Sequence, residues 1–381
     1  MVDPTRIVDA ESPLLENVIA PLRFSLEEDG GPISPSSTSL EYAGRFYKAE
    51  WANPARGKDV PRSKPIAIAH RGSKAKFPEN TMSAFIHAIS VGAQVVETDL
   101  HLSRDGVIVL SHDASLQRCF GINKRIIDCD WQYLSTLRTI REPFEPMPRL
   151  VDLLRYVSSA PERKHVHLLL DIKRDNPAQK LMHALADLLH STTILPEHKP
   201  WNERIILGCW TAKYLTLSHT HLPTYPVCLI SFSLPYARQF QQFPHVIFNL
   251  KLDALMGPCG ARFLADAQGA GHRVFAWTVN EAAFMRWCIR RGIDGVVTDN
   301  VEVLRRACEG GRARCYGHGE GDRGGDGDGE GGGITLRQRV NAFVTAVVLY
   351  LAGSVFAAVY RVDMKEFIGG LYQGLEKAGK T

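Results

Sequence analysis

The 381-residue sequence lacks several features that would assign it to common classes. Its 45 basic and 41 acidic residues nearly balance, so it has no basic footprint for nucleic acid. The eight cysteines include no C-x-x-C pair, and no Asn-x-Ser/Thr sequon occurs. Both absences are typical of a protein with reduced thiols that stays outside the secretory lumen. The first twenty residues contain several acidic side chains and lack the apolar core of a signal peptide.

Composition divides the chain into five segments. Residues 1–62 are rich in Pro, Ser and acidic residues, which predicts a disordered N-terminal arm. Residues 63–308 alternate apolar runs with amphipathic stretches, as expected of one α/β domain. Residues 309–335 are about half glycine and predict a flexible linker. Residues 336–362 predict a transmembrane helix, and residues 363–381 form a short tail.

The apolar segment near the C-terminus contains 21 consecutive uncharged residues, 340–360. As a helix it would span about 31 Å, close to the thickness of a bilayer's hydrocarbon core. The sequence therefore predicts a single C-terminal anchor with the preceding domain facing the cytosol. Endoplasmic reticulum, lipid droplet and mitochondrial outer membrane are the possible locations. Asn, Thr, Gly and Ser residues within the segment also allow a re-entrant or surface-lying helix.

Three short apolar runs between residues 66 and 111 end in chemically capable side chains. The run IAIA is followed by His70-Arg71-Gly72, AQVV by Glu97-Thr98-Asp99, and VIVL, after one serine, by His112-Asp113. An apolar run that ends abruptly in charge suits a strand buried on both faces, with functional groups at its carboxyl end. Three such strands in succession predict the mouth of a (β/α)8 TIM barrel.

The remaining strands are expected at similar apolar runs. We predict eight barrel strands, over residues 66–69, 94–99, 107–111, 167–171, 204–209, 227–232, 274–278 and 295–298. A ninth apolar run, 245–250, has no place in this scheme and suggests an insertion. Helical periodicity predicts helices over 81–91, 149–158, 178–189, 281–291 and 301–307, with Asn80 or Thr81 as the first N-cap. This alternation favours a barrel over a doubly wound sheet only weakly.

The sequence resembles the glycerophosphodiester phosphodiesterase family over residues 64–308. The resemblance is carried by motifs in the family's order, namely HRG (70–72), PENT (78–81), E-x-D (97–99), HD (112–113), LDIK (170–173), WTVN (277–280) and GIDGVVTD (292–299). More narrowly, it resembles the fungal membrane-tethered branch that acts on phosphatidylglycerol, because Asp171 stands where soluble relatives usually carry Glu and an apolar C-terminal segment follows. The resemblance implies the barrel fold and a phosphodiesterase activity.

Three carboxylates form the predicted metal site. Glu97 and Asp99 stand two apart on a strand, so both point to one face. Two adjacent carboxylates repel unless a cation lies between them. With Asp171 they offer three oxygen donors, which suit Mg²⁺ or Ca²⁺ and not zinc. The resemblance implies that the residues at these positions hold the metal. Since Asp171 is one methylene shorter than Glu, a water could bridge it to the ion.

Other residues at the strand ends supply the expected chemistry. The resemblance implies that His70 and His112 act as an acid–base pair, and imidazole has a suitable pKa for this role. Arg71 and Lys173 carry positive charge that would stabilise a phosphorane, although Lys173 could instead pair with Asp171 or Glu97. The predicted substrate pocket also includes Glu79, Asn80 and Trp277, of which Glu79 and Asn80 could support the site or cap the helix.

The resemblance implies an intramolecular reaction, in which a glycerol hydroxyl vicinal to the phosphoester attacks phosphorus and water later opens the cyclic phosphate. Phosphatidylglycerol offers such a hydroxyl on its head group, and lysophospholipids offer one on their own glycerol. We therefore expect a phospholipase C that acts on phosphatidylglycerol. The alternatives are a lysophospholipase D or general glycerophosphodiesterase, and a non-catalytic barrel that binds lipid head groups.

Overall fold

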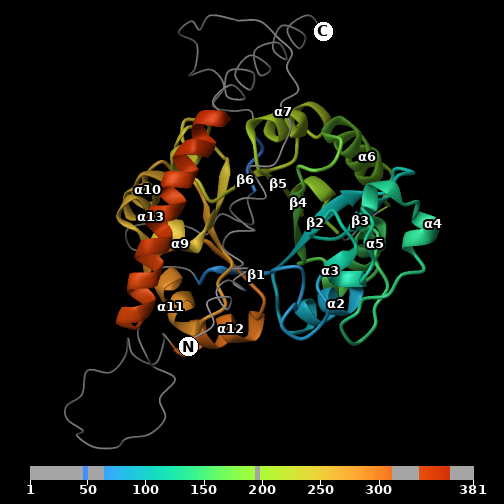
Figure 1. Ribbon diagram of the computed structural model, residues 1–381, viewed down its shortest axis with the longest axis horizontal. Helices are drawn as coiled ribbons and strands as arrows, with labels where there is room; N and C mark the ends of the chain where they lie inside the picture. The colour runs from blue at the N-terminus through green and yellow to red at the C-terminus, as the bar shows by residue number, and fades with distance from the viewer. Residues whose placement is uncertain (1–45, 50–63, 194–197, 311–333, 361–381) are drawn as a thin grey trace, which may run out of the picture.

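The computed structural model describes residues 46–49, 64–193, 198–310 and 334–360. The expected N-terminal arm (1–62) and Gly-rich linker (309–335) lie almost wholly outside the described residues, and the tail (363–381) lies entirely outside them. A ring of strands surrounded by helices forms the body of the molecule, and one long helix runs along its side (Figure 1).

Eight parallel strands close into a barrel, as the sequence predicted. Neighbouring strands pair in parallel around the ring, and pairing between the first two strands along the chain closes it. In order around the barrel the strands are β1 (Ile66–Ala69), β2 (Val95–Leu102), β4 (His167–Ile172), β5 (Ile205–Cys209), β6 (Val227–Ser231), β7 (Ile247–Lys251), β8 (Val274–Trp277) and β9 (Gly295–Thr298).

Two of the strand predictions were wrong. The run at 107–111 was expected to be the third barrel strand, but β3 (Ile108–Leu110) pairs antiparallel with the end of β2 that projects beyond the barrel. The unplaced run at 245–250 is instead a barrel strand, β7. Both runs are short and apolar, and apolar periodicity does not report the direction of a strand. The β2–β3 hairpin returns the chain to the mouth, where the Ser111 amide donates to the Asp99 carbonyl at 3.1 Å.

Helices surround the barrel and connect its strands. Each of the five predicted helices is present, and Thr81 is the N-cap of the first, with its hydroxyl accepting from the Ala84 amide. The α-helices around the barrel are α2 (Met82–Ser90), α3 (Gln117–Phe120), α4 (Trp131–Leu134), α5 (Leu150–Ser158), α6 (Ala178–Ser191), α7 (Ala212–His221), α8 (Leu234–Arg238), α9 (Leu252–Met256), α10 (Pro258–Gly269), α11 (Ala282–Arg291) and α12 (Val301–Gly310). Short 3₁₀ turns lie at Ile126–Asp128, Pro161–Arg163 and Trp201–Glu203.

The barrel interior is apolar away from its mouth. Inward-facing side chains such as Ile68, Leu169, Ile206 and Phe275 form a separate buried cluster inside the ring. A larger cluster lies between the strands and the surrounding helices. Because the lower interior is filled by packed hydrocarbon, inward-facing polar residues can meet water only at the carboxyl ends of the strands.

The last described helix, α13 (Leu336–Val359), covers the predicted membrane segment. By length and composition it could cross a bilayer, with a mean hydropathy of 2.2 over its most apolar window. In the structure it packs against α8 and α9, the short helices that follow β6 and β7, and Leu349 and Phe356 on one face are buried.

Candidate active site

The first barrel turn places His70 and Arg71 at the mouth. Arg71 has a left-handed backbone (φ 55°), which directs its amide to Glu97 Oε2 at 2.7 Å. Gly72 follows at φ 80°, and a Cβ there would lie 2.7 Å from the Ala84 backbone. Only glycine fits this close approach, because any side chain would collide with the first turn of α2. The HRG motif is therefore a tight turn that connects β1 to the site.

The three predicted metal ligands meet at the mouth. Glu97, Asp99 and Asp171 are buried, and one carboxylate oxygen from each lies within 4.8 Å of the others. Glu97 and Asp99 share one face of β2, while Asp171 is the register partner of Asp99 on neighbouring β4. The indole of Trp210, which follows β5, donates to Asp171 Oδ1 at 2.7 Å.

Two cations already contact this cluster. Lys173 Nζ lies 2.8 Å from Asp99 Oδ1 and 2.7 Å from Asp171 Oδ2, and Arg71 Nε lies 3.4 Å from Asp99 Oδ2. Burial alone would raise the pKa of Asp99, yet Lys173 and Arg71 hold it well below the usual range. Burial likewise opposes the charge on Lys173, and the two aspartates more than offset this, so its pKa is raised.

Glu97 is the least compensated acid of the three. Burial raises its pKa well above normal, and the charges of Asp99 and Asp171 raise it further. Burial also raises the pKa of Asp171, although Lys173 opposes this shift. Three buried carboxylates with an excess of negative charge are a donor set that suits a hard divalent cation. Glu97, Asp99 and Asp171 are therefore the residues that could hold such an ion here.

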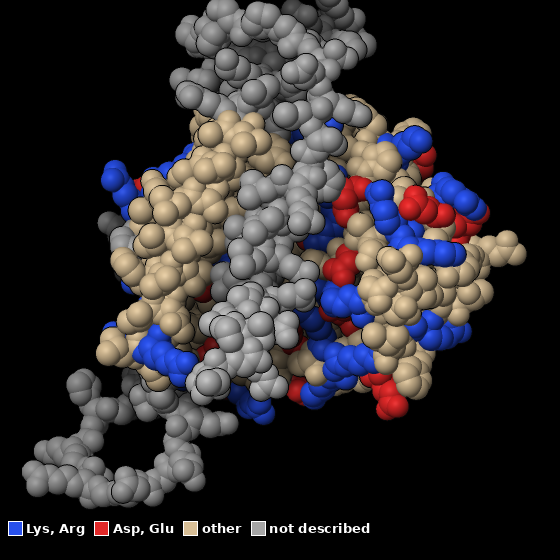
Figure 2. Space-filling view, viewed as in Figure 1, with Lys and Arg blue, Asp and Glu red and all other residues tan. Residues whose placement is uncertain are grey.

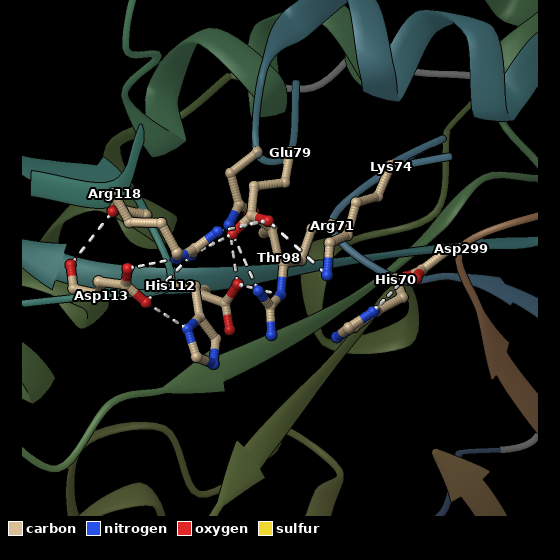
Figure 3. Close-up of polar contacts among 12 residues, drawn as sticks. His70, Arg71, Lys74, Glu79, Thr98, His112, Asp113, Arg118 and Asp299 are labelled. Atoms are coloured by element: carbon tan, nitrogen blue, oxygen red, sulfur yellow. Dashed lines mark hydrogen bonds and ion pairs between the residues drawn. The ribbon is translucent and has the colours of Figure 1, made fainter. Parts of the chain in front are cut away.

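Each predicted catalytic histidine is held through Nδ1 by its own carboxylate. His70 Nδ1 lies 2.6 Å from Asp299 Oδ1, and Asn280 donates to the other oxygen of Asp299 at 2.8 Å. His112 Nδ1 lies 2.7 Å from Asp113 Oδ1. Since Nδ1 is engaged in both rings, Nε2 is the nitrogen left for a substrate. Figure 3 shows His112 and His70 on either side of Arg71.

Both imidazoles are neutral at neutral pH in this state. Burial lowers the pKa of His70 to about 4, and the Arg71 charge adds to the shift against an opposing contribution from Asp299. Burial lowers the pKa of His112 to about 3, with further contributions from Lys173 and Arg71. A neutral imidazole can accept a proton, and an arriving phosphate anion would favour the protonated form that can return it.

Glu79 links the two halves of the site. It accepts from Arg71 at 2.9 Å and from Arg118 at 2.7 Å (Figure 3). Burial opposes its ionisation, but these arginines lower its pKa to about 2. Arg118 also donates to Asp113 at 2.6 Å, so the network reaches the carboxylate that holds His112. Glu79 is thus a bridge between the Arg71 side chain and the His112 pair.

Asn80 connects the first turn to the acids. It is buried with a left-handed backbone (φ 55°), donates to Asp99 Oδ2 at 2.8 Å and accepts from Thr98 at 2.8 Å. Asn80 therefore orients a predicted metal ligand, and the N-cap role belongs to Thr81.

Trp277 lies at the opposite side of the mouth. Its ring is 5.9 Å from that of Trp210 in an edge-to-face arrangement, and Lys251 Nζ lies 5.3 Å above it. The indole donates to the Asn249 carbonyl at 3.0 Å. Trp210 and Trp277 form an aromatic wall at the mouth, where β8 lies across the ring from β4 and its Asp171.

The structure places all ten predicted site residues at this mouth. Sequence reasoning assigned no role to Asp299, Asn280, Asp113, Arg118 or Trp210. Asp113, Asn280 and Asp299 lie within the quoted motifs, and Trp210 directly follows an apolar strand, so strand ends could have suggested these four. Arg118 is on the short helix α3, with no sequence signal, and only the folded β3–α3 segment brings it to Glu79.

The fold and the mouth define an α/β-barrel hydrolase with an acidic centre that could hold a cation, flanked by histidines. The chain belongs to the glycerophosphoryl diester phosphodiesterase family, whose profile matches residues 70–303. It is a phosphoric diester hydrolase of that family, which removes the non-catalytic alternative.

Curated relatives agree with this assignment. A probable glycerophosphodiester phosphodiesterase 2 of Mycobacterium tuberculosis is 27% identical over 248 residues, which cover 63% of this chain and 89% of the relative. A glycerophosphodiester phosphodiesterase domain-containing protein of Macaca fascicularis is 28% identical, and the match spans 63% of this chain but 41% of the relative. A lysophospholipase D of Rattus norvegicus is 44% identical over 61 residues, which are 16% of this chain and 19% of the relative.

Solved structures share the fold. A putative glycerophosphoryl diester phosphodiesterase from Silicibacter pomeroyi superposes with a TM-score of 0.59 at 20% identity, covering 70% of this chain and 98% of that chain. A phosphodiesterase from Oleispira antarctica, solved with the product sn-glycerol-3-phosphate, gives a TM-score of 0.57 at 20% identity over 65% of this chain and 97% of that chain.

Proposed function

We propose that this enzyme is a metal-dependent phospholipase C that cleaves phosphatidylglycerol to diacylglycerol and glycerol 3-phosphate. The observation that carries the proposal is the pair of carboxylate-held histidines, His70 with Asp299 and His112 with Asp113, beside a buried acidic cluster. This arrangement suits proton transfer to and from two oxygens of one phosphodiester. A lipid substrate agrees with the apolar helix that packs against the same domain.

The proposed reaction begins with the head-group glycerol. One histidine accepts the proton of the C2 hydroxyl as its oxygen bonds to phosphorus. The bond from phosphorus to the diacylglycerol oxygen breaks, and the other histidine, protonated in the substrate complex, donates its proton to that oxygen. Water then opens the cyclic glycerol phosphate by the reverse pattern of proton transfers. Because the nucleophile is part of the substrate, its proximity replaces a bimolecular encounter.

The remaining site residues stabilise charge and hold geometry. Arg71 and Lys173 stand beside the acids and would contact the non-bridging phosphate oxygens, where negative charge increases in the transition state. Glu97, Asp99 and Asp171 would hold Mg²⁺ or Ca²⁺, which supplies Lewis-acid stabilisation of the phosphate when bound. Asn80 and Trp210 fix the carboxylates of Asp99 and Asp171.

A second candidate function is a lysophospholipase D or general glycerophosphodiesterase. The observation that favours it is the 44% identity to a rat lysophospholipase D, although this covers only 61 residues. The same site would serve, with attack from the lysolipid's own glycerol hydroxyl and release of the head-group alcohol. Membrane association through α13, with the barrel on the cytosolic side, fits either lipid substrate.

The products separate the two candidates. Purified full-length enzyme with Mg²⁺ or Ca²⁺ is incubated with detergent-dispersed phosphatidylglycerol, lysophosphatidylcholine or glycerophosphocholine, and products are identified by mass spectrometry. We expect diacylglycerol and glycerol phosphate from phosphatidylglycerol. Choline release with phosphatidylglycerol untouched would establish the second candidate instead. No product from any of the three would contradict both.

A matched substrate tests the intramolecular step. Phosphatidyl-1,3-propanediol has the same charge and shape as phosphatidylglycerol but lacks the C2 hydroxyl of the head group. We expect no detectable turnover of this lipid, while it still competes with phosphatidylglycerol. Turnover comparable to that of phosphatidylglycerol would show that water attacks directly, and the mechanism would need revision.

A further inference from the structure

Helix α13 lies along one edge of the barrel end that carries the site. In the described part of the chain, its polar contacts with the barrel involve residues that follow the carboxyl ends of strands, including a hydrogen bond from Gln338 to Glu281, after β8. Arg174, after β4, donates to the Tyr360 hydroxyl at 2.9 Å. The buried hydroxyl of Ser233, after β6, donates to the Gly353 carbonyl at 2.6 Å. The helix is therefore attached to the rim of the mouth, beside β6, β7 and β8.

The inner face of α13 is closely fitted to this rim. A Cβ at Gly353 would lie 2.9 Å from Ser233 Oγ, so the helix backbone touches the rim directly. The ring of Phe356 lies 5.3 Å from that of Phe232 and 5.2 Å from that of Tyr236. An upright helix detached from the barrel would expose these rings and leave the Ser233 hydroxyl without this acceptor.

The outer face of α13 is apolar and uncovered. Fourteen large apolar side chains are exposed in the described residues, and ten of them are on this helix. No Lys, Arg, Asp or Glu occurs from residue 340 to 359. Figure 2 shows this uncharged band beside a region where charged side chains gather on the same face of the molecule. A continuous apolar surface of this kind marks a site of contact with a partner or a membrane.

A second apolar projection also emerges at the mouth end. Ile140 and Phe144 are 60% and 59% exposed. Their loop is tied to the segment after β1, because Arg141 donates to the carbonyls of Lys74, Ala75 and Phe77. Apolar side chains thus project at the same end of the barrel from the β1–α2 side and from the α13 side.

We propose that α13 stays on the barrel rim and lies in the plane of a phospholipid bilayer, so that the active-site mouth faces the membrane. The occupant of the outer face is the boundary between head groups and acyl chains, into which an apolar helix face sinks about 5–10 Å. Arg337 and Arg339 at the start of the helix would contact anionic head groups. The inference rests on the proposed lipid substrate, because this orientation presents head groups directly to the site.

The first test separates membrane contact from chemistry. Val344, Val348 and Val355 are 55%, 49% and 56% exposed on α13. The triple variant Val344→Ser/Val348→Ser/Val355→Ser should bind vesicles of phosphatidylglycerol and phosphatidylcholine at least about tenfold more weakly in flotation, since it loses apolar area at the interface. Its turnover of water-soluble glycerophosphoglycerol should stay within twofold. The matched control is Ile86→Ser, a 42% exposed residue on α2, which should float like the wild type.

Unchanged flotation of the triple variant would overturn the proposal, as would a change in oligomeric state with vesicle binding intact, which would assign the face to a second copy. Vesicle binding with no turnover of any phosphodiester would leave the docking inference standing and contradict the proposed function. The two failures are therefore distinguishable.

The second test asks whether the helix stays on the rim. A Cβ at Gly257 would lie 2.8 Å from Ala346 Cβ, about 1 Å closer than in a disulfide. A disulfide between these two positions would hold the helix on the rim. The variant Gly257→Cys/Ala346→Cys, which also carries Cys259→Ser, is reconstituted with vesicles, oxidised and tested by flotation. The control is the Ala346→Cys/Cys259→Ser protein, which cannot form this disulfide. We expect the locked enzyme to bind vesicles and hydrolyse their phosphatidylglycerol within threefold of the reduced form. Release on oxidation, or retention of wild-type protein in membranes after alkaline carbonate extraction, would show a spanning helix and overturn the proposal.

Discussion

Asp299 offers the sharpest test of the site because sequence reasoning gave it no role. Its carboxylate lies 2.6 Å from His70 Nδ1 and is itself held by Asn280. Asp299→Asn preserves the shape of the side chain and removes its charge. The amide of the new side chain can donate to Nδ1, which would shift the imidazole proton to Nε2, the nitrogen proposed to face the substrate.

The expected loss follows from two contributions. A hydrogen bond to a charged group contributes about 1.5–3 kcal/mol, which corresponds to roughly 10- to 150-fold in rate if it is lost in the transition state. The wrong tautomer adds to this, and the same substitution in a serine-protease triad costs about 10⁴-fold in kcat. We therefore expect kcat to fall by about 10²- to 10⁴-fold, while KM changes little.

The assay is steady-state hydrolysis of phosphatidylglycerol in detergent micelles with saturating Mg²⁺ or Ca²⁺. Metal affinity should be unchanged, because Asp299 is not among the clustered acids. The matched control is Asp266→Asn, which removes an aspartate from a half-exposed ion pair with Arg238 and should stay within twofold of wild type. A folded Asp299→Asn enzyme with kcat within threefold of wild type would refute the assignment of Asp299 as the group that orients His70.

The remaining predictions concern the histidines, the acids and acid stability. His112→Ala should lower turnover at least about a hundredfold with folding intact by circular dichroism, and a loss under threefold would remove it from the mechanism. Chelation should abolish activity. In titration calorimetry, Glu97→Gln should weaken metal affinity, while Asp171→Glu should keep much of it. Full activity in excess chelator, with no metal found by elemental analysis, would contradict the three-carboxylate site. The pKa of His70 falls from 6.5 to about 4 on folding, so the unfolded chain binds more protons below pH 6.5. This residue should therefore lower the free energy of unfolding by about 2 kcal/mol as the pH falls from 7 to 5. His70→Gln should show that much less acid sensitivity in urea titrations at the two pH values, and an unchanged slope would argue against a buried neutral His70.

The sequence alone located the strand ends that carry the predicted site residues, and its resemblance to the family indicated the barrel. Apolar runs ending in His70, Glu97, Asp99 and Asp171 signalled strand carboxyl ends, and in a parallel barrel all such ends meet at one mouth. These features depend on local pattern and on a rule of topology, so they can be read without coordinates.

Tertiary structure decided what local pattern does not encode. The direction of β3 and the barrel position of β7 depend on which strands pair, and a short apolar run is compatible with either arrangement. Contacts of Asp299 with His70 and of Arg118 with Glu79 join residues 229 and 39 positions apart, so only the closed fold brings them together. Helix α13 is the clearest case. Hydropathy reports that its residues avoid water, but whether lipid or the barrel rim covers each face depends on the shape of the surface that it meets.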